Sequence, residues 1–394
     1  MKYFKRSVES TRAPTEEERE RVLNIMEKAY KPVRWRLPDD FDSYERFLDV
    51  VKRLNYQSSP GWPYCREAPT VGEWLKYDGI SYDTYQLQRL WHDTQAVMRG
   101  EFEHVFKTFV KQEPHKPSKV EEGRWRLIIA AALPVQCAWH LLFDYQNDLE
   151  IDKAYEIPSQ QGIIFPGGGW KAFYQQWKSF GYTHGKDMSA WDWTVPGWVF
   201  LLELEFRRRM GSGKRMDEWM KIAKILYRDA FCEAKLLLTD GTVWQQIHAG
   251  IMKSGVVNTI STNSHGLAIV HIVACLRQLV DPEPLPRVVG DDQVVVRKHA
   301  DLCYDTLGIS VKPSVEAVEF VGHVFVDEGP QPCYLPKHLA NFTRCSKGYE
   351  ADYLDAMARM YAHSPYWVIW EDLAERIGVC LPSRESCLYW YDVD

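Results

Sequence analysis

The segment 287–296, R-V-V-G-D-D-Q-V-V-V, constrains the fold most strongly, because two valine-rich runs flank a short acidic turn. Valine favours strands, and a glycine followed by aspartate between two such runs is typical of a hairpin. That hairpin would place Asp291 and Asp292 together at one end of a sheet. Adjacent carboxylates repel each other and usually need cations. Gly-Asp-Asp is also an ordinary turn, so this pattern alone leaves both a cation site and a plain turn open.

The rest of the chain mixes helical and strand patterns without the regular alternation of a doubly wound sheet, which favours an α+β fold. Strands are predicted at 106–110 and 127–132, with a hairpin at 235–247 around Asp240-Gly241. Helices are predicted at 15–30 (with Thr15 as the N-cap), at 197–230 and at 256–279.

Composition narrows the class of protein. The 394 residues are 45% hydrophobic and 26% charged, which argues against disorder, and the net charge of −6 argues against a simple basic nucleic-acid binder. The nine cysteines form no C-x-x-C pair, so no zinc ribbon is indicated, and scattered thiols fit a reducing compartment. The longest apolar helical stretch, 267–276, is interrupted by His271 and is too short to span a bilayer. We therefore expect an intracellular protein with no transmembrane segment of its own.

A second acidic segment, K-D-M-S-A-W-D-W-T-V, carries Asp187 and Asp192 across a predicted strand-to-helix turn. A nucleotidyl transferase needs carboxylates from at least two separate segments to hold two Mg²⁺ ions roughly 3.5–4 Å apart. Asp187 and Asp291 could supply them. The alternative is that Asp187 is an ordinary helix N-cap.

The segment S-G-V-V-N-T-I-S-T-N places Thr259 and Asn263 four residues apart, on one face of a predicted helix. A cap followed by a solvated face would give the same pattern. A site that recognises ribose also fits, because Asn263 and Ser254 could hydrogen-bond with Asp192 around a 2′-hydroxyl.

Positive charge is concentrated in one segment, 111–128, of this otherwise acidic chain. Such a cluster can bind a triphosphate and neutralise a pyrophosphate leaving group. A solvated surface is the alternative, since three glutamates partly neutralise the segment. The basic residues are Lys111, Lys116, Lys119, Arg124 and Arg126, and the glutamates are Glu113, Glu121 and Glu122.

Taken together and in this order, these segments resemble the motifs of positive-strand RNA virus RNA-dependent RNA polymerases. The runs D-x-S-x-W-D-W at 187–193 and E-E-G-R-W-R-L-I at 121–128 are most similar to the sobemovirus and polerovirus-like (solemovirid) group. The loop S-S-P-G-W-P-Y at 58–64 resembles the template-contacting finger motif of picornavirus-type polymerases. The resemblance spans about residues 57–325.

The resemblance implies roles for individual residues. Asp187 and Asp291 would ligate two Mg²⁺ or Mn²⁺ ions, with Asp292 supporting them, and Lys312 would protonate the pyrophosphate unless it is simply a solvated lysine. Glu319-Phe320 resembles a primer-grip segment, with a plain strand as the alternative. The remaining assignments are ribose selection by Asp192, Ser254, Thr259 and Asn263; triphosphate binding by Lys111, Lys119, Arg124 and Arg126; and template contact by Ser59 and Gly61.

The implied fold is a right hand. Fingers would cover 1–184 with an insertion at 206–245, the palm 185–205 and 246–330, and a small helical thumb 331–394; the palm would be an antiparallel sheet flanked by helices. The implied function is template-directed RNA synthesis from NTPs, replicating a positive-strand RNA genome. Expected partners are the template, the nascent strand, a virus-encoded protein primer and other replication proteins, in a membrane-associated complex in the host cytoplasm. The rival hypotheses are a reverse transcriptase and a non-catalytic RNA-binding scaffold.

Overall fold

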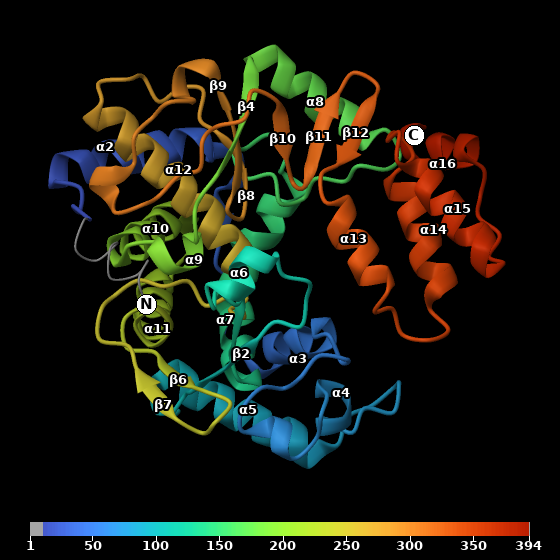
Figure 1. Ribbon diagram of the computed structural model, residues 1–394. Helices are drawn as coiled ribbons and strands as arrows, with labels where there is room; N and C mark the ends of the chain where they lie inside the picture. The colour runs from blue at the N-terminus through green and yellow to red at the C-terminus, as the bar shows by residue number, and fades with distance from the viewer. Residues whose placement is uncertain (1–10, 394) are drawn as a thin grey trace.

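The valine-rich hairpin forms as predicted. In the computed structural model, which describes residues 11–393, β8 (Arg287–Val289) and β9 (Asp292–Val296) pair antiparallel, and β4 (Tyr182–Asp187) pairs with the other edge of β9. The resulting sheet has the order β4-β9-β8 and lies at the top of Figure 1. Gly290 has φ +62° in the turn, a conformation that glycine adopts without a Cβ penalty.

A second antiparallel sheet packs beside the first through a close backbone approach. It contains β10 (Val318–Phe320), β11 (His323–Val326) and β12 (Gly329–Pro332). The Gly185 N–H of β4 donates to the Ala317 carbonyl at 2.8 Å. A Cβ at Gly185 would lie 2.6 Å from the Glu319 carbonyl oxygen. Glycine at this position therefore allows the two sheets to meet.

The helix below the first sheet, α12 (Thr259–Arg277), is the central element of the core. It packs against β8, α10 (Gly197–Met210) and α2 (Glu16–Ala29), which begins at the predicted cap Thr15. The expectation that this stretch is too short to span a bilayer is wrong, because the helix continues to the N-terminal side of residue 267. By length and composition alone, its 19 residues could cross a membrane. However, 83% of its most apolar 18-residue stretch is buried inside the protein, as in the core helix of a globular fold.

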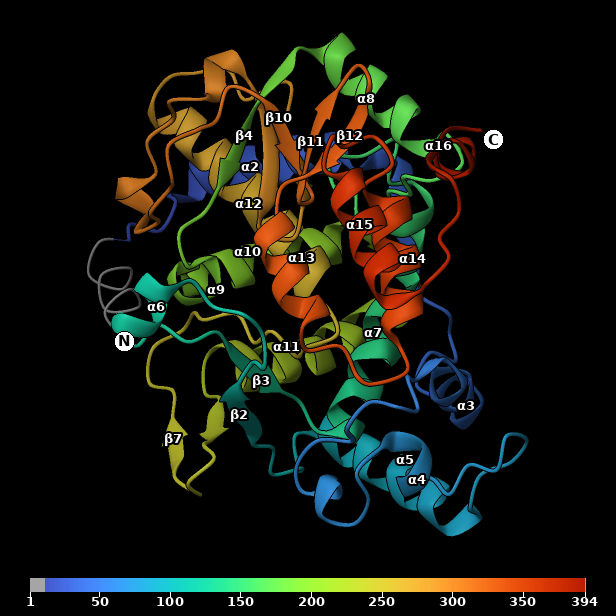
Figure 2. The same cartoon turned by 45° about the vertical axis from the view of Figure 1, so that its right-hand side comes forward.

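The predicted strands of the lower lobe form a third sheet, ordered β3-β2-β6-β7 (Figure 2). Its strands are β2 (Phe106–Val110), β3 (Leu127–Ala130), β6 (Lys235–Leu237) and β7 (Val243–Gln245). The hairpin around Asp240-Gly241 is confirmed. The predicted helical region 197–230 is two helices, α10 and α11 (Met216–Phe231), separated by the short strand β5 (Gly211–Ser212).

The remaining elements of the first two hundred residues are mostly helices. They are η1 (Lys31–Val33), β1 (Trp35–Arg36), α3 (Tyr44–Arg53), η2 (Tyr64–Arg66), α4 (Val71–Trp74), α5 (Thr84–Arg99), α6 (Pro117–Glu121), α7 (Leu133–Asp152), α8 (Gly169–Phe180) and α9 (Trp191–Thr194). Two short 3₁₀ turns follow β9, η3 (Arg297–His299) and η4 (Asp305–Leu307).

The C-terminal region is a small helical unit, as the sequence predicts for the thumb. It contains α13 (Leu335–Phe342), α14 (Glu350–Met360), α15 (Trp367–Ile377) and α16 (Arg384–Asp392), which lie together at the right of Figure 1. The last helix returns to the start of α8: the Trp170 indole donates to Asp392 Oδ1 at 2.8 Å, and the Gly168 N–H donates to the Tyr391 carbonyl at 3.0 Å. These contacts fasten the helical unit to the sheets.

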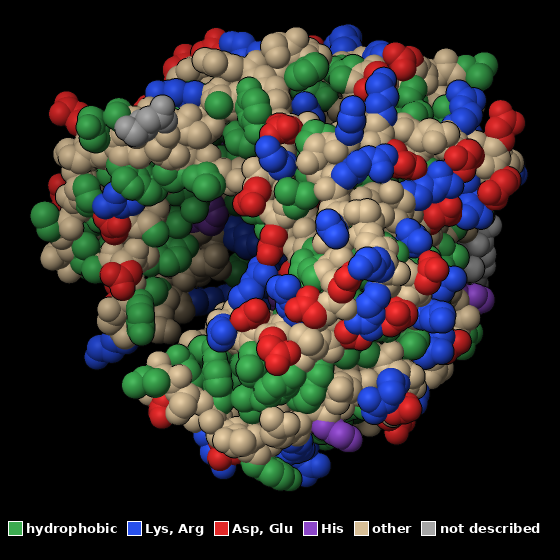
Figure 3. Space-filling model, turned by 180° about the vertical axis from the view of Figure 1, so that it is seen from behind, with side chains coloured by type: hydrophobic (Ala, Val, Ile, Leu, Met, Phe, Trp, Pro, Cys, Tyr) green, Lys and Arg blue, Asp and Glu red, His purple; other side chains and the backbone are tan. Residues whose placement is uncertain are grey.

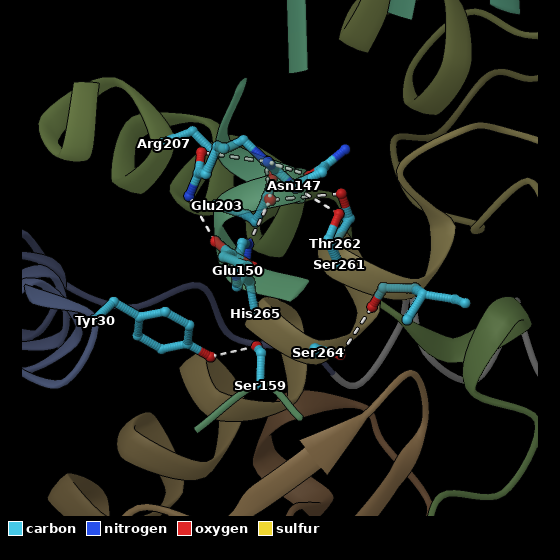
Figure 4. Close-up of polar contacts among 12 residues, drawn as sticks. Tyr30, Asn147, Glu150, Ser159, Glu203, Arg207, Ser261, Thr262, Ser264 and His265 are labelled. Atoms are coloured by element: carbon cyan, nitrogen blue, oxygen red, sulfur yellow. Dashed lines mark hydrogen bonds and ion pairs between the residues drawn. The ribbon is translucent and has the colours of Figure 1, made fainter. Parts of the chain in front are cut away.

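A buried charged cluster joins α12 to two neighbouring helices (Figure 4). Glu203 of α10 pairs with Arg207 one turn later and lies 2.9 Å from His265 Nδ1 of α12. The other ring nitrogen of His265 lies 3.0 Å from Glu150 of α7. All four side chains are fully buried. Arg207 also donates to Gln146, Asn147 and Ser261. Because buried charges are tolerated only when paired and hydrogen-bonded, this cluster fixes how α7, α10 and α12 pack together.

We expect Arg207→Met to lower the free energy of unfolding by about 3–5 kcal/mol, because it leaves Glu203 buried without its strongest partner. Arg208→Met is the matched control. Arg208 pairs with the exposed Asp217 at 3.2 Å, and such surface pairs contribute less than about 1 kcal/mol. Urea denaturation of both variants measures the difference. Equal losses would show that the buried cluster does not stabilise the fold.

Candidate active site

Three carboxylates meet where β4 ends and β9 begins. In the antiparallel register Asp187 lies opposite Asp292, and Asp291 precedes it in the turn. The Gly290 N–H donates to Ser264 Oγ at 2.9 Å, so α12 anchors the acidic turn from below. Ser264 is not predicted from the sequence, where its only signal is its place directly after Asn263.

Loss of hydration, followed by repulsion between neighbouring carboxylates, raises the pKa values of Asp291 and Asp292. Reduced hydration and then the charges of Asp291 and Asp187 raise the pKa of Asp292 to about 7. Asp291 remains accessible to solvent, but loss of hydration and the charge of Asp187 raise its pKa as well. Lys312 forms an ion pair with Asp187 Oδ2, which offsets part of this repulsion. Carboxylate oxygens are the ligands that Mg²⁺ and Mn²⁺ prefer, so the set of donors fits the expected divalent ions.

Asp192 and Asn263 lie together beside this acidic group. Burial and then the charge of Asp291 raise the pKa of Asp192 to about 6, while a hydrogen bond from Asn263 opposes the shift. The Trp191 indole donates to Asn263 Oδ1 at 2.9 Å. Since an indole N–H can only donate, it fixes the amide so that its NH₂ group is free to donate to Asp192. This role of Trp191 is not predicted from the sequence, although the residue stands within the D-x-S-x-W-D-W run.

The other two residues assigned to ribose selection engage the backbone. Ser254 Oγ accepts from the Ile129 N–H at 3.2 Å, which ties its loop to β3. Thr259 Oγ1 donates to the Val256 carbonyl at 2.7 Å and to the Lys253 carbonyl at 3.1 Å. The structure therefore brings Asp192 and Asn263 together, whereas the Ser254 and Thr259 hydroxyls support the loop that leads into α12.

The basic segment is held by one glutamate. Glu113 lies 3.3 Å from Lys111 Nζ and 3.5 Å from Arg126 Nη1, and it also meets Lys337 of α13 at 3.2 Å. Arg126 lies near enough to the acidic group to lower the pKa values of Asp192 and Asp291. Figure 3 shows a hollow on this molecule with Lys and Arg side chains gathered along its wall.

The other two residues predicted to bind the triphosphate, Arg124 and Lys119, form no ion pair with Glu113 among the described residues. Arg124 pairs with Glu122 at 2.7 Å, and Lys119 is exposed at the end of α6. Arg126 is thus the basic residue of this segment whose charge acts on the carboxylates.

The predicted template loop rests on the start of α7. The Leu133 N–H donates to the Pro60 carbonyl at 2.9 Å, and Ser59 Oγ accepts from the Gly61 N–H at 3.3 Å. Gly61 has φ +71°, and a Cβ there would lie 2.6 Å from the Ala131 carbonyl oxygen. The close approach explains the glycine without requiring RNA.

The predicted primer-grip pair lies in β10. Glu319 is close enough to raise the pKa of Asp292, and Phe320 is buried among the aromatic residues beneath the sheets. The segment is therefore a strand at the margin of the acidic group.

A family model described as viral RNA-dependent RNA polymerase matches residues 36–328. The chain belongs to this family. Among its relatives, the replicase polyprotein P2AB of Southern cowpea mosaic virus is 32% identical over 344 residues, covering 80% of this chain and 34% of the relative. Protein P1-P2 of Turnip yellows virus is 26% identical over 356 residues, covering 80% and 33%. The resemblance to sobemovirus and polerovirus proteins is confirmed. The chain spans about a third of the length of these curated relatives.

A solved Sicinivirus 3Dpol RNA-dependent RNA polymerase shares the fold. It aligns with a TM-score of 0.77 at 17% identity, over 97% of this chain and 86% of that one. The predicted right-hand α+β architecture, with antiparallel palm strands flanked by helices and a small helical thumb, is confirmed.

Ser264→Ala should loosen the acidic turn, because the Gly290 N–H loses its acceptor. Leaving such a group unpaired costs about 1–3 kcal/mol, so amide exchange in 287–296 should accelerate. Hydrogen exchange read by mass spectrometry measures it. Ser179→Ala is the control: Ser179 Oγ donates to the Gln176 carbonyl of its own helix at 2.7 Å, as Ser264 Oγ does to the Ile260 carbonyl at 2.8 Å. Unchanged exchange at the turn in Ser264→Ala would contradict the anchor.

Proposed function

We propose that this chain synthesises RNA from NTPs on an RNA template and so replicates a positive-strand viral genome. The observation that carries the proposal is the meeting of Asp187, Asp291 and Asp292 at the strand ends, beside the Asp192–Asn263 pair, in a member of this family. Acidic groups from separate segments, next to a polar pair able to recognise a sugar hydroxyl, suit nucleotidyl transfer to RNA.

In the proposed reaction the 3′-hydroxyl of the nascent strand attacks the α-phosphate of an NTP, and pyrophosphate leaves. Two divalent ions, Mg²⁺ or Mn²⁺, held by Asp187, Asp291 and Asp292, would supply activation of the hydroxyl and charge for the leaving oxygens. Lys312, next to Asp187, can donate a proton to the pyrophosphate. The triphosphate would be held by Lys111, Lys119, Arg124 and Arg126.

Ribose selection follows from the Asp192–Asn263 pair. With a pKa of about 6, Asp192 is mainly ionised at neutral pH and can accept a hydrogen bond from a 2′-hydroxyl. The Asn263 NH₂ group can donate to the same hydroxyl oxygen. Ser254 and Thr259 would act by holding the preceding loop, and Ser59 and Gly61 would guide the template.

We further propose fingers, palm and thumb at the expected ranges, with two boundaries moved. Position 184/185 falls inside β4 and position 205/206 inside α10, so the divisions belong before Tyr182 and after Met210. The proposed setting is a replication complex at membranes of the host cytoplasm, reached through other replication proteins, with a virus-encoded protein primer as one candidate partner. The relatives named replicase polyprotein support a role in viral replication inside the host cell.

The deciding experiment is primer–template extension by the purified chain with Mg²⁺ or Mn²⁺ and with NTPs or dNTPs. We expect template-dependent extension with NTPs, reduced in Asp291→Asn by about a hundredfold to a thousandfold, since removing a charged group at the reacting centre costs about 3–4 kcal/mol. Asp305→Asn, an exposed aspartate outside the site, is the control and should retain activity.

Other outcomes separate the rival hypotheses. Preferential use of dNTPs would indicate a reverse transcriptase. No incorporation with either metal by a folded chain that still binds RNA would favour a non-catalytic scaffold.

Asn263→Ala should reduce discrimination between an NTP and its dNTP. Loss of a hydrogen bond to a charged or buried group, worth about 1.5–3 kcal/mol, corresponds to a tenfold to hundredfold lower ratio of kcat/KM values. Single-nucleotide incorporation measures this ratio. Asn24→Ala, at an exposed position of α2, is the control. An unchanged ratio in Asn263→Ala would assign sugar selection to other residues.

A further inference from the structure

Two histidines and a cysteine converge in the interior, away from the acidic group. His271 and Cys275 are four residues apart on α12, and His299 ends η3, just after β9. All three side chains are fully buried, and one ligand atom from each lies within 4.8 Å of the others. Among residues 11–393 this is the one group of three or more His, Cys, Asp or Glu residues that meets this distance.

The spacing between two of these atoms suits a tetrahedral ion. His271 Nε2 lies 3.5 Å from Cys275 Sγ. Zinc binds histidine nitrogen at about 2.0–2.1 Å and thiolate sulfur at about 2.3 Å, which in tetrahedral geometry separates the two ligands by roughly 3.5 Å. His271 Nδ1 meets Tyr304 Oη at 3.4 Å on the other side of the ring, so Nε2 is the nitrogen that faces the sulfur.

His299 presents an unused lone pair to the cluster. Its Nε2 lies 2.8 Å from the Asp281 carbonyl, which can only accept, so Nε2 carries the proton and Nδ1 does not. Nδ1 is buried and has no hydrogen-bond partner among the described residues. A metal-binding histidine commonly donates its other N–H to a backbone carbonyl, which orients the ring for coordination.

We propose that His271 Nε2, Cys275 Sγ and His299 Nδ1 bind a zinc ion, with water as the fourth ligand. On binding, the sulfur–metal bond forms and the thiol proton leaves to solvent. The site joins α12 to the chain that follows β9, so the ion would brace the hairpin that carries Asp291. This inference does not depend on the proposed polymerase activity.

The surrounding charges set a limit on the affinity. Lys186 Nζ donates to the His299 carbonyl at 3.1 Å and lies over the Tyr304 ring, and Lys298 pairs with Asp281 at 3.2 Å. Both ammonium groups repel a bound zinc ion, but they also stabilise the Cys275 thiolate. A sulfur ligand with two imidazoles selects zinc over the Mg²⁺ or Mn²⁺ expected at the carboxylates.

The first test uses the unmutated full chain, so it does not depend on how variants fold. We expect stoichiometric zinc by elemental analysis, and after exchange with cobalt(II) a thiolate-to-cobalt charge-transfer band. Carboxylate-bound cobalt cannot give this band, so the assay separates the two kinds of site. Absence of both zinc and the band would overturn the proposal.

Variants then locate the ion. Cys275→Ser and His299→Gln should abolish the band and weaken zinc binding by more than the ten- to hundredfold typical of losing a supporting residue. Cys303→Ser, at an exposed cysteine nearby, should keep both. Retention of the band in Cys275→Ser would place the metal on another cysteine and would also overturn the proposal.

Discussion

The buried pairing of Glu203 with Arg207 and His265 is the constraint on which the rest of this structure depends. Charged side chains that are buried away from water must keep their ion-pair partners, so the helices that carry these side chains cannot slide or rotate independently. The cluster fixes α12 against α7 and α10, and α12 in turn carries Asn263 and anchors the acidic turn through Ser264. The positions of Asn263 and of the acidic turn therefore depend on the buried charged cluster.

The sequence was most informative where local chemistry decides the structure. Valine runs around Gly290 predict the hairpin because branched side chains and a left-handed glycine each have strong conformational preferences. The runs D-x-S-x-W-D-W and E-E-G-R-W-R-L-I, in combination with the other segments, predicted the family, and the family match confirms it. By contrast, the polar residues of α12 suggested a solvated face as one alternative, whereas the helix is buried on nearly all sides.

What the sequence could not provide depends on contacts between distant segments. The role of Trp191 requires its indole to reach Asn263 from another helix, and nothing local encodes that distance. Ser254 looks like a sugar ligand from spacing alone, yet its hydroxyl accepts from β3. The sequence shows Glu113 only as a charge that neutralises its basic neighbours. Its ion pair with Lys337 of α13 joins two segments far apart in the chain, so it could be seen only in the folded structure. The three metal-binding candidates of the core were likewise hidden, because no C-x-x-C spacing marks them.

Asn263 and Ser264 are consecutive residues of one helix, and this adjacency has a mechanical consequence. The first contacts Asp192, and the second holds the backbone of the turn that precedes Asp291. A small rotation of α12 would therefore displace the Asn263–Asp192 contact and the acidic turn together. If Asn263 recognises the sugar as proposed, a substitution that shifts this helix would change sugar recognition and the positions of the carboxylates at the same time.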